Sequence, residues 1–231
     1  MRLLLINDSG VIGGGAENLI RMLLDEFLKR EIFEEIHLLQ PETIHKTDRR
    51  NIIVHHCPSG YLSSYRLTKQ IIKNQRIDIV QVYNLQRLLP FPILAARKLN
   101  IPVVWGAYDY WPLCAYRSFV NPYKAQSMAL CEKAKFKKCV RCVGTKTALR
   151  LKLFQWIISK ADVAISPGNF VKDLYESHNV LKGKWRIVKP WVALDTFGNI
   201  KQGEIANQII FVGSLADYKG GWVAAESLKY I

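Results

Sequence analysis

Short apolar runs alternate along the chain with stretches whose apolar residues recur every three or four positions. The runs are typical of buried parallel strands, and the second pattern is typical of helices that bury one face. Strands are expected at Arg2–Asn7, Glu35–Gln40, Ile52–Cys57, Asp78–Tyr83, Pro102–Ala107, Asp162–Ser166 and Trp185–Val188. Helices are expected at Ala16–Arg30, Ser64–Asn74, Leu88–Leu99 after Pro92, Thr147–Lys160 and Asn169–Ser177. This alternation predicts an α/β fold, a Rossmann-like parallel sheet with helices on both faces.

The pattern changes after residue 190. Residues 191–206 are irregular and polar and are interpreted as a linker, followed by an expected strand at Gln208–Gly213 and an expected helix at Gly221–Ile231. One strand and one helix do not bury a core by themselves. We therefore expect residues 1–190 to form one domain, with a cysteine-rich insertion at 114–142. Residues 207–231 are expected to be the incomplete start of a second Rossmann-like domain.

Composition and charge narrow the class of protein. The 231 residues are 49% hydrophobic, which is ordinary for a globular protein. There is no apolar run of about 18 residues and no signal peptide pattern, so we expect a cytoplasmic protein. The net charge of +14 favours an anionic partner, which is a nucleic acid, a membrane surface or a phosphorylated substrate. Nine lysines and arginines and one acid lie between Lys124 and Lys152.

Four of the five cysteines lie within residues 114–142, which overlap this basic region. Cys139 and Cys142 are separated by two residues, and Cys114 and Cys131 precede them at irregular spacing. Four thiolates can bind a structural zinc ion in tetrahedral geometry, so we treat the four as candidate zinc ligands. Disulfides and free thiols are the alternatives. Cys57 is expected to be a core thiol, and the histidines form no recognisable site.

Polar and glycine residues follow several of the expected strands. Gly14, Gly15 and Glu17 lie between the first strand and the first helix, where glycines let the backbone approach a phosphate or a sugar. A P-loop Lys-Ser/Thr pair and a spaced dinucleotide fingerprint are absent, which disfavours ATP hydrolysis and NAD chemistry. Asn84 ends another strand, and Tyr108 and Asp109 follow Pro102–Ala107. Ligands bind at the carboxyl edge of such sheets.

A similar strand, loop and helix are expected near the end of the chain. The loop contains Ser214 and Lys219, and a lysine at this place can neutralise a diphosphate.

Together these segments resemble glycosyltransferase family 4, whose members have the GT-B fold. The resemblance covers nearly the whole chain, and the order and spacing of its pieces carry it more than any single motif. The matching segments are Gly14–Glu17 (GGAE), the strand ending at Asn84, Pro102–Cys114 (PVVWGAYDYWPLC), Ala161–Tyr175 (ADVAISPGNFVKDLY) and Ile209–Gly221 (IIFVGSLADYKGG).

The resemblance implies two Rossmann-like domains with an active site between them. It implies transfer of a sugar, of the hexosyl type, from a nucleotide-sugar donor with retention of anomeric configuration and without a catalytic metal. The residues that would bind the substrate or the donor are Gly14, Gly15, Glu17, Asn84, Ser214 and Lys219. Tyr108 and Asp109 would be the catalytic residues, in the wall of the acceptor cleft. The net charge favours an anionic or lipid-linked acceptor and peripheral contact with an anionic membrane.

Three departures from the family pattern bear on function. Tyr108 stands where the family usually has histidine, and Ser214 where it often has arginine. The paired glutamates that hold the donor in the family are not within this sequence, so the chain is expected to need a further donor domain. A zinc-bearing, basic nucleic-acid-binding protein and a non-catalytic binding protein on the same scaffold are the alternatives, with nucleic acid the less expected partner.

Overall fold

The computed structural model describes residues 1–9, 14–44, 51–58, 60–117, 119, 131, 135–191, 209–213 and 219–230. The chain divides into two compact units, Met1–Trp191 and Val192–Ile231. Each unit is described by itself. Apart from residue 191, the expected linker lies outside the described residues.

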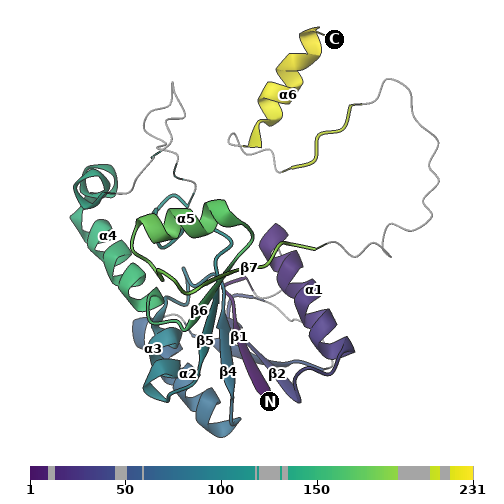
Figure 1. Cartoon of the computed structure of the whole chain (residues 1–231), viewed down its shortest axis with the longest axis vertical. Coiled ribbons are helices and arrows are strands. Elements are labelled where there is room, and N and C mark those ends of the chain that lie inside the picture. The colour runs from purple at the N-terminus through teal and green to yellow at the C-terminus, as the bar shows by residue number, and fades with distance from the viewer. Residues whose placement is uncertain are drawn as a thin grey trace, which may run out of the picture. The chain divides into compact units, whose positions relative to one another are not determined.

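The first unit is a seven-stranded parallel sheet in the order β3-β2-β1-β4-β5-β6-β7 (Figure 1). Its strands are β1 (Arg2–Ile6), β2 (Glu35–Pro41), β3 (Ile53–Cys57), β4 (Ile79–Val82), β5 (Val103–Gly106), β6 (Val163–Ser166) and β7 (Trp185–Ile187). Its helices are α1 (Gly15–Lys29), α2 (Tyr61–Asn74), α3 (Phe91–Lys98), α4 (Phe136–Ile158) and α5 (Asn169–Ser177). The predicted Rossmann-like α/β fold is confirmed, and the seven strands expected in this unit form.

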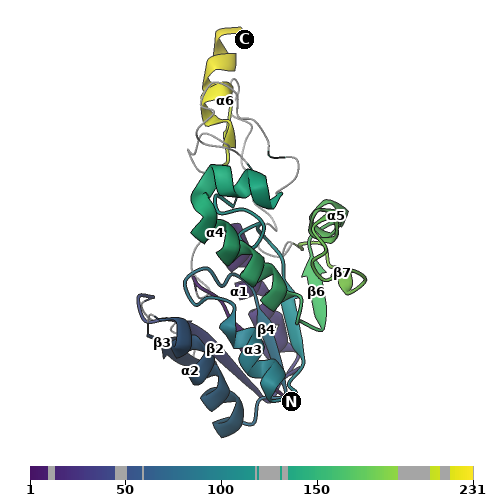
Figure 2. The ribbon, with the colours of Figure 1, turned by 90° about the vertical axis from the view of Figure 1, so that its left-hand side faces the viewer.

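The core has two layers that meet at β1. On one face, Leu3 and Leu5 pack with Ile20 and Leu24 of α1. On the other face, Leu4 and Ile6 belong to a larger cluster that draws on α2, α3, α4 and α5. Figures 1 and 2 show α1 on one side of the sheet and α2, α3 and α4 on the other. Because both faces of β1 are covered, its sequence is an uninterrupted apolar run.

Helix α4 begins earlier than the sequence indicates. We expected a helix from Thr147, preceded by a cysteine-bearing loop, but α4 starts at Phe136 and contains Cys139 and Cys142. Gly144 interrupts it with φ of 80° and ψ of 160°, which kinks the helix. Glycine adopts positive φ at little cost, so helix can continue on both sides of it. The glycine and the charged residues before it interrupt the apolar pattern, so the sequence did not indicate the first half of the helix.

In its described residues, the second unit lacks the strand that the sequence predicts. Residues 209–213 form no strand, and Ile209, Ile210 and Val212 are exposed by 60%, 72% and 91%. A strand is held by hydrogen bonds to a neighbouring strand, and the described residues of this unit offer none. The expected helix forms as α6 (Gly221–Ser227), and a 3₁₀ turn, Leu228–Tyr230, follows it. Among the described residues no helix is long and apolar enough to cross a membrane.

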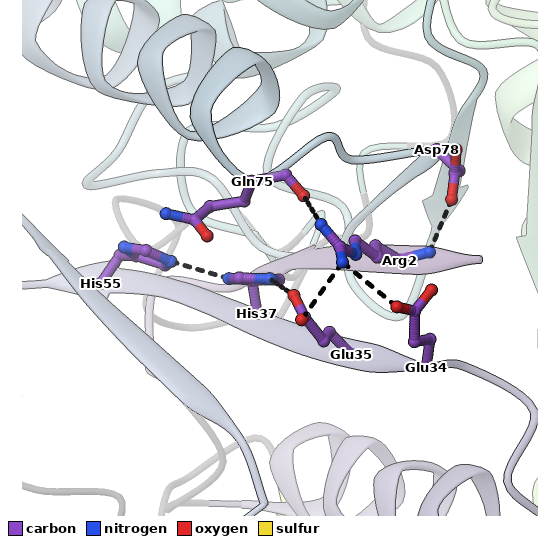
Figure 3. Close-up of polar contacts among 7 residues, drawn as sticks. All are labelled: Arg2, Glu34, Glu35, His37, His55, Gln75 and Asp78. Atoms are coloured by element: carbon purple, nitrogen blue, oxygen red, sulfur yellow. Dashed lines mark hydrogen bonds and ion pairs between the residues drawn. The ribbon is translucent and has the colours of Figure 1, made fainter.

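Arg2 links the beginnings of three strands, at the edge of the sheet opposite the carboxyl ends (Figure 3). Its backbone N–H donates to Asp78 Oδ2 at 2.7 Å, just before β4. Its guanidinium contacts Glu34 at 3.1 Å and Glu35 at 3.4 Å, at the start of β2, and donates to the carbonyl of Gln75. These ion pairs are partly exposed, so solvent screens them and each contributes little to stability.

A histidine pair joins β2 to β3 near this cluster, although the sequence indicated no histidine site. His37 Nδ1 and His55 Nε2 lie 3.0 Å apart, and the rings stack with centroids separated by 5.3 Å (Figure 3). His37 is fully buried, and its Nε2 lies 3.3 Å from Glu35 Oε2. With His37 Nε2–H donating to Glu35, His37 Nδ1 accepts a hydrogen bond from His55 Nε2–H. Burial, and then the charges of His37 and His56, lower the pKa of His55.

Replacement of His55 by phenylalanine tests this pair. The lowered pKa of His55 means that the unfolded chain takes up a proton more readily as pH falls below about 6.5. The stability that His55 contributes is therefore present above that pH and decreases as pH falls through it. We expect the free energy of unfolding to drop by about 1 kcal/mol in His55→Phe at pH 7.5 and by less at pH 5. Urea unfolding of both proteins at the two pH values measures the difference, and equal drops would contradict the coupling.

Candidate active site at the switch point of the sheet

The strand order reverses at β1, which has β2 on one side and β4 on the other. Such a reversal separates the connections that follow neighbouring strands and leaves a crevice at the carboxyl edge. The structure has a pocket of about 280 Å³ there. It is lined by Asn7, Ser9, Gly15, Ala16, Glu17, Ile20, Tyr83, Asn84, Gly106, Tyr108, Asp109 and Arg117.

This lining brings together five of the residues that the sequence singled out. Gly15 and Glu17 come from the start of α1, Asn84 follows β4, and Tyr108 and Asp109 follow β5. Gly14 is the residue before α1, and a Cβ placed on it would lie 3.6 Å from Glu17 Oε2. A Cβ placed on Gly15 would have no neighbour within 4 Å, so packing does not require glycine at either position.

The start of α1 contributes backbone N–H groups to this edge. Gly14 precedes the helix in an extended conformation and makes no side-chain capping bond. The first turn of a helix has N–H groups without partners within the helix, and its dipole favours a negative charge. Glu17 lies in that turn.

The ends of β1 and β4 are tied together by two side chains that the sequence analysis did not select. Asn7 Oδ1 accepts the N–H of Asn84 at 3.2 Å. The carboxylate of Asp8 accepts the N–H groups of Arg87 and Leu88. Asp8 is 3% exposed, and burial raises its pKa to about 6, against the effect of those N–H donors. The only signal in the sequence was an acid directly after a buried strand.

The floor of the pocket depends on the missing side chain of Gly106. A Cβ on Gly106 would lie 2.4 Å from two carbons of the Tyr83 ring. Tyr83 is buried and accepts a hydrogen bond at its hydroxyl from Gln81 Nε2 at 2.7 Å, so its ring has little room to turn. The ring of Tyr108 stacks on it, with centroids 5.7 Å apart. Glycine at 106 therefore lets Tyr83 support Tyr108.

Asp109 is held from two sides. Its Oδ1 accepts the N–H of Trp111 at 3.2 Å, and its backbone carbonyl accepts the hydroxyl of Tyr175 at 2.7 Å. Burial raises the pKa of Asp109 to about 6, the Trp111 N–H and Arg117 oppose this rise, and Glu17 adds to it. At pH 7 the carboxylate is mostly ionised, yet it accepts a proton more readily than an exposed aspartate. These are the properties of a general base.

Tyr108 has a different character. Burial raises its pKa, so its hydroxyl stays protonated near neutral pH. A phenol in this state donates or accepts a hydrogen bond but carries no proton away. Tyr108 can therefore orient a bound hydroxyl group, and Asp109 is the residue of the pair that can take a proton.

The four candidate zinc ligands converge in the first unit. Cys114, Cys131 and Cys139 pack against the larger core cluster. Burial raises the pKa of Cys139, and negative charge on Cys131, Cys114 and Cys142 raises it further. The thiols are thus near enough to influence one another. No group of three or more potential ligands among the described residues is arranged to hold a metal ion, however. The zinc site therefore stays a prediction, because the described residues show no coordination geometry for it.

The two remaining predicted residues belong to the second unit. Lys219 is exposed and lies two residues before α6. Ser214 lies outside the described residues.

Fold and pocket together define a Rossmann-like domain with a pocket at the switch point of its sheet. The model of Glycosyltransferase Family 4 matches residues 13–196, and the chain belongs to that family. The family and fold identify a glycosyltransferase domain of the GT-B type. A comparison with curated proteins gave no match.

Solved structures resemble the fold at low sequence identity. The lipopolysaccharide outer core galactosyltransferase WaaB in its apo form has a TM-score of 0.51 and 12% identity, and the match covers 82% of this chain and 45% of that one. UGT73P12 of Glycyrrhiza uralensis, complexed with glycyrrhetinic acid 3-O-monoglucuronide, has a TM-score of 0.47, 13% identity and coverages of 82% and 48%. MurG of Acinetobacter baumannii has a TM-score of 0.46, 11% identity and coverages of 87% and 50%. The chain spans about half the length of these proteins.

Replacement of Gly106 by alanine tests the floor of the pocket. The added methyl group has to displace the buried ring of Tyr83, and overpacking of this kind costs about 1–3 kcal/mol. We expect a loss of stability in that range, measured by urea unfolding. Gly168→Ala is the matched control, because its φ is −173° and a Cβ there has no neighbour within 4 Å. Equal stability of the two variants would show that Tyr83 does not depend on Gly106.

Proposed function

We propose that this chain supplies the acceptor side of a retaining glycosyltransferase that transfers a hexosyl group from a nucleotide-sugar to a hydroxyl group. The observation that carries the proposal is Asp109, a carboxylate with a pKa of about 6 in a pocket that also holds Tyr108 and Glu17. Tyr108 orients the acceptor hydroxyl, and Asp109 is its base. In the transfer, the acceptor oxygen bonds to the anomeric carbon on the same face from which the bond to the diphosphate breaks, so the configuration is retained. The diphosphate leaves with the electron pair, and the hydroxyl proton passes to Asp109.

Gly15, Glu17 and Asn84 line the pocket, Gly14 precedes α1, and all four are proposed to bind substrate or donor. Glu17 suits a sugar hydroxyl better than a phosphate because it is itself an anion. Ser214 and Lys219 are proposed to contact the donor diphosphate. We propose that turnover also needs donor-binding residues of a complete second Rossmann-like domain. Turnover by the 231-residue chain alone would contradict that requirement without touching the role of Asp109.

Replacement of Asp109 by asparagine tests the base in a protein that carries both complete domains. General-base catalysis contributes about 10²- to 10⁴-fold, so we expect kcat/KM to fall by at least about 100-fold. Because the base acts in its ionised form, kcat/KM of the unmodified protein should fall as pH drops through about 6, and the variant should lack this limb. Release of nucleoside diphosphate measures the rate, and NMR of the product gives its anomeric configuration.

The control is Asp173→Asn, because Asp173 is an exposed residue of α5 outside the pocket. Activity of Asp109→Asn close to that of the control would exclude Asp109 as the base. An inverted product would contradict the retaining mechanism alone.

We further propose that Cys114, Cys131, Cys139 and Cys142 hold a structural zinc ion. Support comes from the four sulfur ligands and from the effect of neighbouring thiols on the pKa. Burial and the neighbouring thiols raise the pKa of Cys139 and Cys142, and a cation among them would stabilise the thiolates together. Cys139 and Cys142 are three residues apart in α4 and so lie on one side of the helix. The ion would join the start of α4 to the segment after β5. A disulfide arrangement is the alternative.

Metal analysis of the purified chain tests the zinc proposal. We expect about one zinc per chain and its loss in Cys139→Ser with Cys142→Ser. Cys57→Ser is the control, because Cys57 is a buried thiol at the end of β3. Four readily titrated thiols together with no bound zinc would contradict the proposal, and two missing thiols without zinc would indicate a disulfide.

A further inference from the structure

Helix α4 carries an exposed apolar stripe after its kink at Gly144. Leu149, Leu153 and Trp156 are exposed by 55%, 44% and 53%. Their spacing of four and three residues places them along one side of the helix. The helix buries Leu151, Phe154 and Ile158 on its other side. The stripe, defined as Leu149, Leu153 and Trp156, is therefore additional to the face that the core uses.

Basic residues flank the stripe. Lys146, Arg150 and Lys152 are exposed, and the sequence of α4 holds six lysines and arginines and no acid. The Lys160 ammonium lies 4.9 Å from the centroid of the Trp156 ring, which keeps a cation beside the indole. Apolar side chains and cations thus share one surface.

A groove of about 460 Å³ runs beside the stripe, between α4 and α3. Its walls include Lys146, Leu149, Arg150 and Leu153 from α4 and Phe91 from α3. Figure 2 shows this half of α4 on the outside of the helical layer, facing the viewer. The cations at its rim match the phosphate of a lipid, and the apolar groove matches its acyl chain.

We propose that the α4 stripe and its flanking cations dock this protein on an anionic membrane surface. Cations attract the headgroups, and the leucines and tryptophan enter the boundary between headgroups and acyl chains, where aromatic residues are favoured. A soluble polyanion would satisfy the cations but leave the stripe in water. Charge complementarity and the exposed apolar area together select a lipid surface. The pocket that contains Asp109 does not include the stripe. Its carboxylates, Glu17 and Asp109, would repel an anionic membrane.

Vesicle co-sedimentation of the 231-residue chain tests the proposal. Phosphatidylcholine vesicles with about one third phosphatidylglycerol are compared with pure phosphatidylcholine vesicles, and binding is expected on the first. Lys146→Glu with Arg150→Glu should lower binding at least about tenfold, because each basic residue near the surface contributes about fivefold. Leu149→Gln, Leu153→Gln and Trp156→Gln together should lower it by at least about tenfold on the same vesicles.

Matched controls come from α2, which also has exposed residues of both kinds. Arg66→Glu with Lys73→Glu repeats the charge change, and Leu62→Gln repeats the apolar change at a side chain that is 59% exposed. Both controls should bind within about twofold of the unmodified chain. Thermal unfolding checks that each variant is folded, and Leu153→Gln by itself is the fallback should the triple variant unfold.

Three results would overturn the proposal. Binding that the apolar variants leave unchanged would mean simple electrostatic adsorption. An equal loss in the α2 charge variant would mean that net charge and not α4 decides. Tight, salt-dependent binding to an oligonucleotide, abolished by Lys146→Glu with Arg150→Glu but not by the apolar variants, would assign the surface to a nucleic acid. The assay contains no donor or acceptor, so its failure would leave the transferase proposal untouched.

Discussion

The reversal of strand order at β1 is the constraint on which the rest of the structure depends. β1 has a parallel neighbour on each side and a helical layer on each face, so the connections diverge at its carboxyl end and leave a pocket there. The buried carboxylate of Asp8 holds the segment after β4 beside this end by accepting the N–H groups of Arg87 and Leu88. A buried carboxylate without partners would be costly, and its two bonds fix where the chain leaves β4.

The sequence could predict the fold because the strands are buried on both faces and therefore appear as apolar runs. Five pocket residues were also predictable, since the carboxyl ends of parallel strands share one edge. Tyr83 and Gly106 were not, because their relation is steric and only the register of β4 and β5 brings them together. The pairing of His37 with His55 depends in the same way on the register of β2 and β3.

Charge is distributed unevenly over the first unit, and the pattern separates two roles. The pocket contains the carboxylates of Glu17 and Asp109 and one cation, Arg117, although the chain has a net charge of +14. An acidic pocket suits hydroxyl groups and the uptake of a proton. The basic charge concentrates instead on α4, whose sequence has no acid. An anionic group of a partner is therefore favoured more by the surface of α4 than by the carboxylates of the pocket.

The chemistry of Asp109 depends on the aromatic core beneath it. Tyr175 is fully buried and holds the carbonyl of Asp109, and its ring meets Trp105 edge-on with centroids 4.9 Å apart. The indole N–H of Trp105 in turn donates to the carbonyl of Tyr83 at 3.3 Å. One cluster thus connects α5, β5 and the end of β4, the elements that place Asp109 and the floor of its pocket. Because burial is what raises the pKa of Asp109, a cavity opened in this cluster would admit water and lower that pKa without removing any residue from the pocket.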